Sequence, residues 1–152
     1  MNYWLMKSEP GEFSINDLQG MPDQTEHWDG VRNYQARNRL RDEIKIGDLV
    51  FCYHSNCLEP GIAGIMEVCR EGYPDFTAFD PQDKHYDPKS RKDNPRWFMV
   101  NVRFVRKLKR VISLKELKAC PQLKDFALVR RGNRLSIMPV TEEQWQFILS
   151  LE

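Results

Sequence analysis

The stretch WDGVRNYQARNRL, residues 28–40, changes from a loop into a helix, and the predicted fold is built around it. Asp29-Gly30 predicts a turn, because glycine adopts backbone angles that other residues resist. Asn33 predicts the start of the helix, since its side chain can accept a hydrogen bond from a free N–H of the first turn. A helix N-terminus presents unpaired N–H groups and a partial positive charge. The stretch therefore offers a place where an anion or the polar edge of a ring can bind.

Trp28, at the start of this stretch, allows two interpretations. Its flat ring can stack on a planar ligand, as aromatic side chains do with bases. The same residue can instead be a core tryptophan ahead of a surface helix, which is what composition alone favours. We expect a pocket wall that borders solvent, because the turn Asp29-Gly30 follows directly and turns lie at the surface.

The composition is that of a globular protein with one domain over residues 1–152. The chain is 41% hydrophobic and 30% charged, and it is long enough to bury a core. Its apolar runs are too short to span a membrane, and the start MNYWLMKSEP lacks the pattern of a secretory signal. We therefore expect a cytoplasmic protein, in its simplest form a monomer.

The formal net charge of +1 hides a basic segment. Between Arg103 and Arg134 there are 11 Lys or Arg residues against Glu116 and Asp125, a formal charge of +9. Such a segment favours a basic surface on one side of the protein that binds a polyanion. The same number of basic residues could also be spread over separate solvent-exposed strand and helix faces. If it tracks a nucleic-acid backbone, the expected contacts are Lys107, Lys109, Arg130 and Arg131.

Apolar and aromatic runs separated by turn residues predict short strands. They lie at residues 3–7, 49–55, 61–72, 97–112 and 135–140. Gly61 and Gly64 indicate a bulge or a close backbone approach in the third of these. Helices are predicted after the capping residues Ser14, Asn33, Ser113 and Thr141.

The remaining long segment, residues 74–96, is polar and rich in proline. Loops of this length are usually functional or mobile. Short strands with small helices between them, mostly outside βαβ alternation, predict an α+β protein with a mixed or antiparallel barrel.

No motif for catalysis, a metal or a cofactor stands out, so neither a metal nor a cofactor is expected. Cys52, His54 and Cys57 lie close together, but a structural zinc site needs four ligands and the other Cys and His residues are scattered. The serines lack a GxSxG elbow, and neither a P-loop nor GxGxxG is present. In a reducing compartment the four cysteines are expected to be free thiols.

Several segments that end a strand or begin a helix carry short donors and acceptors beside aromatic rings. They are Lys7-Ser8-Glu9, Trp28 to Tyr34, Tyr53-His54-Ser55 and Arg134-Leu135-Ser136. Taken singly, these residues also allow a simpler interpretation, in which the lysine is a surface charge and the serine hydroxyls only stabilise turns. Together they favour a pocket for a flipped nucleobase, which is stacked on an aromatic ring and bound along its edge.

These same segments resemble the EVE domain. YWLMKSEP, WDGVRNYQARN, YHS, GIAGIMEV and RGNRLSIMPV follow one another in the order and spacing of that family, over essentially the whole chain. The chain looks most similar to the small stand-alone bacterial members. The family belongs to the PUA-like superfamily and is related to the YTH readers of methylated adenine. The resemblance implies a PUA-like mixed or antiparallel β-barrel with small flanking helices.

The resemblance also implies which residues surround a bound base. They are Lys7, Ser8, Glu9, Trp28, Asp29, Gly30, Val31, Arg32, Asn33, Tyr53, His54, Ser55, Arg134, Leu135 and Ser136. Trp97 follows the long loop. At this place YTH readers have a second aromatic residue of the cage that surrounds the bound base, so the resemblance adds Trp97 to the expected pocket. Cys52 departs from the larger apolar residue expected before YHS.

Together these features predict a non-enzymatic reader of modified bases in DNA or RNA. One alternative is a small PUA-like hydrolase that acts on a modified nucleoside with a pocket Lys or Glu. Another is an RNA-binding accessory module that acts through the basic segment alone.

Overall fold

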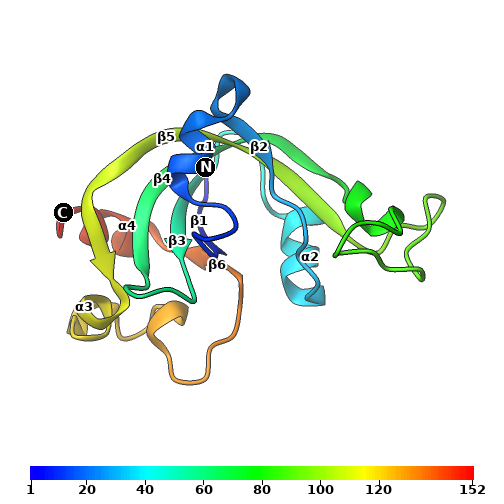
Figure 1. Ribbon diagram of the computed structural model, residues 1–152. Coiled ribbons are helices and arrows are strands. Elements are labelled where there is room, and N and C mark those ends of the chain that lie inside the picture. The colour runs from blue at the N-terminus through cyan, green and yellow to red at the C-terminus, as the bar shows by residue number, and fades with distance from the viewer.

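A six-stranded mixed sheet with helices on both faces organises the chain (Figure 1). The computed structural model covers residues 1–152. The strands lie in the order β2-β5-β4-β3-β1-β6, and only β1 and β3 are parallel neighbours. The strands are β1 (Tyr3–Ser8), β2 (Thr25–His27), β3 (Leu49–His54), β4 (Gly61–Pro74), β5 (Phe98–Ser113) and β6 (Ile137–Val140). The α+β class is confirmed, and β2 is a strand that the sequence did not predict.

The sheet is open, so the expected barrel is wrong. A barrel requires the two edge strands to pair, and β2 and β6 do not. β2 has three residues, all paired with β5, and β6 has four, including Pro139, which has no N–H to donate. Edge strands this short, one of them interrupted by proline, cannot form the ladder that closure needs.

The helices begin where the capping residues predicted. They are α1 (Ile15–Gly20), α2 (Tyr34–Asp42), α3 (Leu114–Lys118) and α4 (Glu142–Leu149). The side chains of Ser14, Asn33, Ser113 and Thr141 each accept a hydrogen bond from an N–H of the first turn. Ser113 caps α3 from one side only, because the Glu116 carboxylate pairs with Arg110 and does not reach back to the Ser113 N–H.

The two faces of the sheet carry separate hydrophobic clusters. α1 and α2 pack on one face, with Trp4 and Met6 of β1, whereas α3 and α4 pack on the other face with Leu5. This is the alternation that a strand imposes on successive side chains. It continues to the end of β1, where Lys7 follows the side of Leu5 and lies over the ring of Tyr53, a member of the second cluster.

The close approach predicted at Gly61 and Gly64 of β4 is confirmed. A Cβ at Gly61 would lie 2.4 Å from the Ile112 carbonyl oxygen, and one at Gly64 would lie 2.6 Å from the Ile15 side chain. The register also shifts between Cys52 and Tyr53. The missing side chain at Gly64 therefore lets α1 sit against the sheet.

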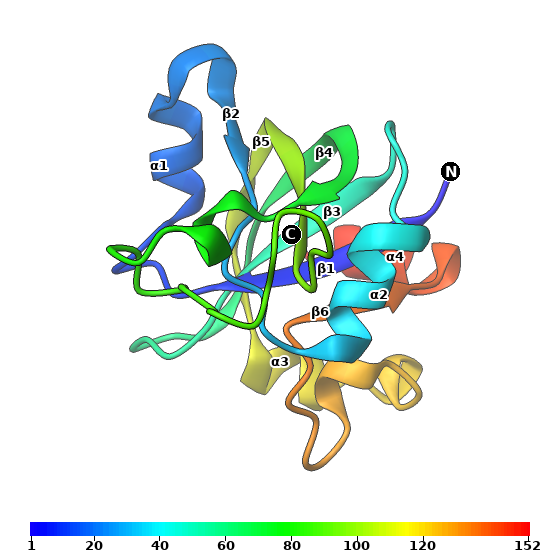
Figure 2. The ribbon, with the colours of Figure 1, turned by 90° about the vertical axis from the view of Figure 1, so that its right-hand side faces the viewer.

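The segment between β4 and β5 is the long loop that the sequence predicted. It contains one short 3₁₀ turn, Phe76–Phe79, and otherwise runs irregularly in front of the sheet, beside α2 (Figure 2). None of the helices is both long and apolar enough to cross a membrane. A cytoplasmic location and a monomeric state remain predictions.

Candidate functional site

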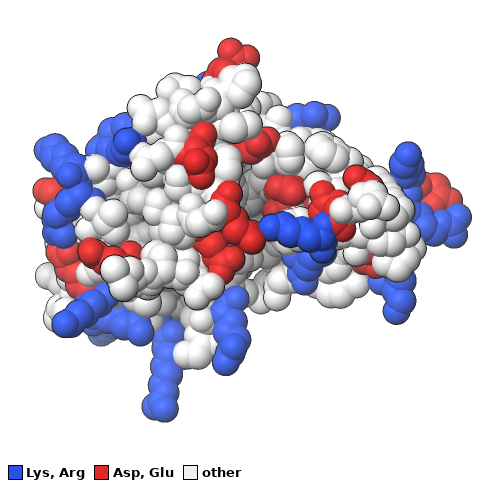
Figure 3. Space-filling model, in the orientation of Figure 1, with Lys and Arg blue, Asp and Glu red and all other residues white.

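A cavity of about 440 Å³ opens between the end of β1, the segment that follows β2 and the long loop. It lies on the face shown in Figure 3, where carboxylates gather between the sheet and the loop. Nine residues that the sequence predicted line it, namely Lys7, Ser8, Glu9, Trp28, Asp29, Gly30, Val31, Arg32 and Ser136. Six further lining residues were not predicted from the sequence, namely Glu12, Phe13, Glu26, His27, Lys84 and His85.

The irregular segment after β2 is held in place by the long loop. Gly30 has φ +79°, and its N–H donates to Asp75 Oδ2 at 2.8 Å. A Cβ at this position would lie 2.5 Å from Cε1 of His85, so only glycine lets the His85 ring pack here. The turn predicted at Asp29-Gly30 does not form as a hydrogen-bonded turn, and Gly30 is instead a contact point between two segments that are distant in the sequence.

Asp75 is the buried centre of this contact. Its carboxylate accepts hydrogen bonds from the Gly30 N–H, the Thr77 N–H and Nη1 of Arg32, the last at 2.9 Å. Burial by itself would raise the pKa of Asp75, but the hydrogen bonds from Thr77, Gly30 and Arg32 outweigh it and hold the pKa below its usual value. Arg32 also donates to the His85 carbonyl at 2.8 Å, so its guanidinium is used to fasten the loop.

Trp97 lies outside the cavity, in a stack that ties the loop to α2. Its ring is 4.8 Å from the Tyr34 ring, centroid to centroid, and the Arg32 guanidinium lies 5.4 Å from its centroid. The Trp97 indole N–H donates to Asp87 Oδ2 at 2.7 Å. Trp97 thus supports the loop that carries His85, and its ring does not line the cavity.

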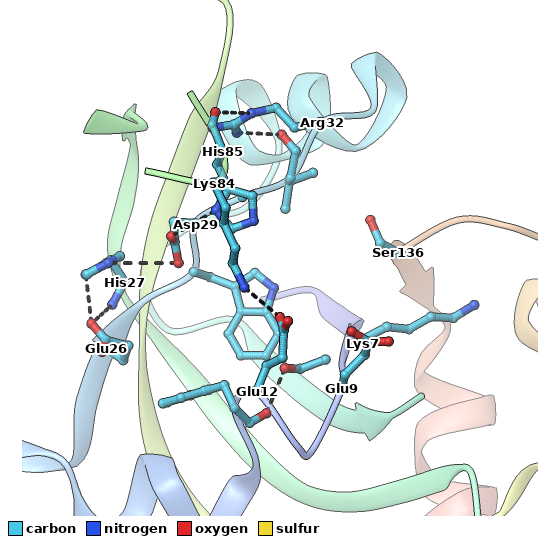
Figure 4. A pocket seen from close by; sticks show the side chains of 15 residues that line it. Lys7, Glu9, Glu12, Glu26, His27, Asp29, Arg32, Lys84, His85 and Ser136 are labelled. Atoms are coloured by element: carbon cyan, nitrogen blue, oxygen red, sulfur yellow. Dashed lines mark hydrogen bonds and ion pairs between the residues drawn. The ribbon is translucent and has the colours of Figure 1, made fainter. Parts of the chain in front are cut away.

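One wall of the cavity is made of carboxylates and imidazoles (Figure 4). Glu26 Oε1 lies 2.7 Å from His27 Nδ1. The Asp29 carboxylate lies between two imidazoles, 3.9 Å from His27 Nε2 and 3.7 Å from His85 Nδ1. Both distances exceed a hydrogen bond, so Asp29 keeps free acceptor capacity, and the buried Nδ1 of His85 has no hydrogen-bond partner.

An ion pair links the two sides of the cavity mouth. Lys84 on the long loop reaches Glu12 between β1 and α1, with Nζ 3.0 Å from Oε2 (Figure 4). Both side chains are well exposed, so the pair adds little to stability. The positive charge of Lys84 is nevertheless already paired with the Glu12 carboxylate.

Trp28 combines the two interpretations that the sequence left open. It lines the cavity, yet it is only 7% exposed and belongs to the first hydrophobic cluster, where it packs edge-on against Phe13. Trp28 is thus a wall of the cavity, but the expectation that its side chain borders solvent is wrong, because most of the ring is buried in the core. The reason is that its N–H still pairs with the Val100 carbonyl, at 2.8 Å, so the chain leaves the sheet only after Trp28.

The YHS segment supports the cavity without lining it. The Tyr53 side chain belongs to the second hydrophobic cluster, on the other face of the sheet. His54 Nε2 accepts the Ile15 N–H at 3.1 Å, and burial lowers the pKa of this imidazole, so the ring is neutral and fastens α1. The Ser55 N–H donates to the Ser8 carbonyl at 2.9 Å. Asn33, Arg134 and Leu135 are likewise absent from the lining.

The segment before β6 brings Ser136 to the cavity. The Lys7 N–H donates to the Ser136 carbonyl at 2.9 Å, which continues the pairing of β1 with β6. Asn133 folds the preceding turn by donating to the Ala127 carbonyl and accepting the Leu135 N–H. The turn leaves Arg130, Arg131 and Arg134 exposed.

The basic segment does not form one continuous surface. Arg103, Arg106 and Arg110 are paired with carboxylates of Glu67, Glu152 and Glu116. Lys107 and Lys109 lie on the half of β5 that runs away from the long loop (Figure 1). Figure 3 shows Lys and Arg side chains projecting from the lower edge, around the segment coloured orange in Figure 1. Of the four predicted backbone contacts, Arg130 and Arg131 are the ones on the segment that leads to the cavity.

No group of three or more His, Cys, Asp or Glu side chains is arranged to hold a metal ion. Cys52 is fully buried, and burial raises the pKa of its thiol to about 12, so it is not a thiolate. A polar cavity beside the end of β1 in an open mixed sheet makes this a small α+β domain with a candidate ligand-binding site. A profile of the EVE domain matches residues 2–151, and the chain belongs to the EVE domain family.

The relatives come from eukaryotes and bacteria alike. Rat thymocyte nuclear protein 1 is 54% identical, over 99% of this chain and 74% of its own length. A crystal structure of a Pseudomonas syringae protein is 52% identical, with a TM-score of 0.94 and 98% of each chain covered. The crystal structure of human THYN1 protein in complex with DNA containing 5-methylcytosine is 51% identical, with a TM-score of 0.94 and coverage of 99% and 97%. The similarity therefore does not single out the bacterial members.

Proposed function

We propose that this chain binds nucleic acid by accepting one modified base in the cavity, without catalysing a reaction on it. The observation that carries the proposal is the likeness to human THYN1 protein, whose crystal structure is a complex with DNA containing 5-methylcytosine. The likeness extends over 99% of this chain. The cavity-lining residues, from Lys7 to Ser136, thus lie in a chain that this likeness covers almost completely.

The chemistry of the cavity supports a base as the ligand. Trp28 and Phe13 supply aromatic surface, and the Asp29 carboxylate supplies an acceptor that no protein donor occupies closely. Cytosine and adenine present an exocyclic amino group that donates hydrogen bonds, and carboxylates accept from such groups. The acceptor-rich wall thus favours a base with an amino group on its edge.

Binding is favoured over hydrolysis because three side chains that could take part in hydrolysis, those of Ser8, His54 and Glu9, are each already engaged in a hydrogen bond within the protein. The Ser8 hydroxyl donates to the Phe13 carbonyl at 2.7 Å, and His54 accepts the Ile15 N–H. Glu9, one of the residues a hydrolase would use, accepts a hydrogen bond from Asn56. These contacts support a binding site over a site of covalent chemistry.

The test compares oligonucleotides that differ at a single base. Fluorescence anisotropy with matched strands carrying cytosine or 5-methylcytosine, single- and double-stranded, should give tighter binding to the modified strand. A parallel incubation with modified nucleosides, analysed for released base and ammonia, should show no turnover. Equal affinity for both strands, or multiple turnovers that disappear in Glu9→Gln, would contradict the proposal.

A further inference from the structure

The ammonium of Lys7 is a half-buried cation at the cavity that no carboxylate neutralises. Its side chain lies over the Tyr53 ring, with Nζ 5.8 Å from the ring centroid, and it takes part in none of the ion pairs of the protein. Burial lowers the pKa of Lys7, since no opposite charge offsets the loss of hydration. Lys84, in contrast, is held by Glu12, and Arg32 by Asp75. An uncompensated cation of this kind costs stability, so an anionic ligand is the natural partner.

Strand geometry separates Lys7 from the wall that would hold the base. Lys7 is in register with Tyr53 and shares the face of the sheet on which Leu5 and Tyr53 pack. Trp28 belongs to the cluster on the opposite face, with Met6. Lys7 therefore reaches the cavity around the end of the sheet.

The cavity consequently has two chemically different ends (Figure 4). At one end lie Glu26 and Asp29 with the imidazoles of His27 and His85. At the other end the Lys7 side chain points away from Asp29, on the side where Ser136 lies. The segment that carries Ser136 is the one that also carries the exposed Arg130, Arg131 and Arg134. The Glu26 and Asp29 carboxylates at one end and the Lys7 ammonium pointing away at the other match the polarity of a nucleotide.

We propose that Lys7, together with the Ser136 hydroxyl, holds a backbone phosphate of the nucleotide whose base occupies the cavity. The inference rests on the proposed function and fixes the direction in which the nucleotide enters. The base edge faces Asp29, and the backbone leaves along the segment Arg130–Ser136. It moves Lys7 from the base contacts implied by the resemblance to the backbone contacts, where a lysine acts as a point charge on phosphate.

The first test uses the salt dependence of binding. Each phosphate contact contributes about −0.9 to the log–log slope of affinity against salt for duplex DNA, and about −0.7 for a single strand. Lys7→Met should make the slope shallower by about that amount and leave the ratio of affinities for modified and unmodified strands unchanged. Lys45→Met is the matched control, because Lys45 is exposed and pairs only loosely with Glu71, at 3.8 Å. It should alter neither quantity.

The second test uses small ligands. Wild-type protein should bind 5-methyl-2′-deoxycytidine monophosphate, with the phosphate at the 3′ or the 5′ position, more tightly than the nucleoside. Lys7→Met should abolish the gain, and Lys7→Arg should retain part of it. Thermal unfolding checks that each variant is folded, and Ser136→Ala provides a second, smaller loss of the same gain.

The outcomes separate the two proposals. A wild-type protein that does not distinguish modified from unmodified strands contradicts the proposed function, whatever Lys7 does. If the wild-type protein shows that preference, the phosphate contact is tested by Lys7→Met. A variant with a lower preference for the modified strand, but with an unchanged salt slope and an unchanged gain from the monophosphate, overturns the phosphate contact. Absence of any nucleic-acid binding overturns both.

Discussion

The His85 ring packs directly on Gly30, so closely that a Cβ at Gly30 would lie 2.5 Å from the His85 ring. The two residues are far apart in the sequence, and Arg32 holds them together by donating to the His85 carbonyl. This contact joins the irregular segment after β2 to the long loop. It brings His85 within 3.7 Å of the Asp29 carboxylate, so the contact forms one wall of the cavity.

Gly30→Ala should weaken both the fold and the binding of a modified strand. The φ of +79° is strained for alanine, and the new methyl group must displace the His85 ring. We expect a loss on the order of 1–3 kcal/mol in the free energy of unfolding, measured with urea. Gly11→Ala is the control, because a Cβ at Gly11 meets nothing within 4 Å and should leave stability almost unchanged. Unaltered stability and binding in Gly30→Ala would show that the contact is not needed.

Asp75→Asn should destabilise the protein through Arg32. The substitution removes the charge of a fully buried carboxylate that the Arg32 guanidinium contacts at 2.9 Å. We expect the free energy of unfolding to fall by about 3 kcal/mol, the lower end for breaking a buried ion pair, because Arg32 itself is partly exposed. Asp80→Asn, an exposed carboxylate in the same loop, should change stability by less than about 0.5 kcal/mol. Equal stability of the two variants would argue against Asp75 as the centre of the loop contact.

Trp28→Ala should cost stability as well as binding. Trp28 is buried in the first hydrophobic cluster, so we expect a loss of about 3–5 kcal/mol from the cavity that its removal leaves. Trp28→Phe retains an aromatic ring and should lose less of both. Urea unfolding measures the first effect, and affinity per folded molecule measures the second. Near-native stability of Trp28→Ala would contradict its place in the core.

Glu152 should make the protein sensitive to acid. Hydrogen bonds from Arg106, and to a lesser extent from the Lys109 N–H, lower the pKa of Glu152 to about 2, below the value of about 4.3 for an unfolded glutamate. A lowered folded-state pKa gives stability that is present above the unfolded pKa and is lost as the pH falls toward 2. Wild type should thus exceed Glu152→Gln in stability at pH 7, and the difference should shrink between about pH 4 and pH 2. Glu59→Gln, in an exposed loop, serves as the control, and a difference that is constant with pH would refute the assignment.

The elements that local signals specify were predicted from the sequence. Apolar and aromatic runs between turn residues identified β1, β3, β4, β5 and β6, and side-chain caps such as Asn33 identified the helices. β2 was missed because Thr25–His27 has no apolar alternation and is a strand only through its pairing with Asn101–Arg103. The barrel was wrong for a related reason, since closure depends on pairing between edge strands and no local pattern encodes it.

The site was predicted in part because its motifs sit at strand ends. Glu26 and His27 directly precede Trp28, so extending the motif toward the N-terminus would have found them. Lys84 and His85 lie in a loop whose path depends on the buried Asp75, and nothing near them in the sequence shows where they fold back. Tyr53 does not line the cavity, because its side chain is buried in the second hydrophobic cluster.

The most direct test of base entry into the cavity follows individual residues by NMR. In a titration of ¹⁵N-labelled protein with a strand carrying one modified base, the Trp28 indole and Gly30 amide signals should shift and saturate at one strand per protein. The Trp145 indole, on the opposite face of the sheet, should stay unchanged and serves as the internal control. Shifts confined to Lys107, Lys109 and the segment around Arg130, with Trp28 and Gly30 unaltered, would contradict binding in the cavity and favour a surface contact.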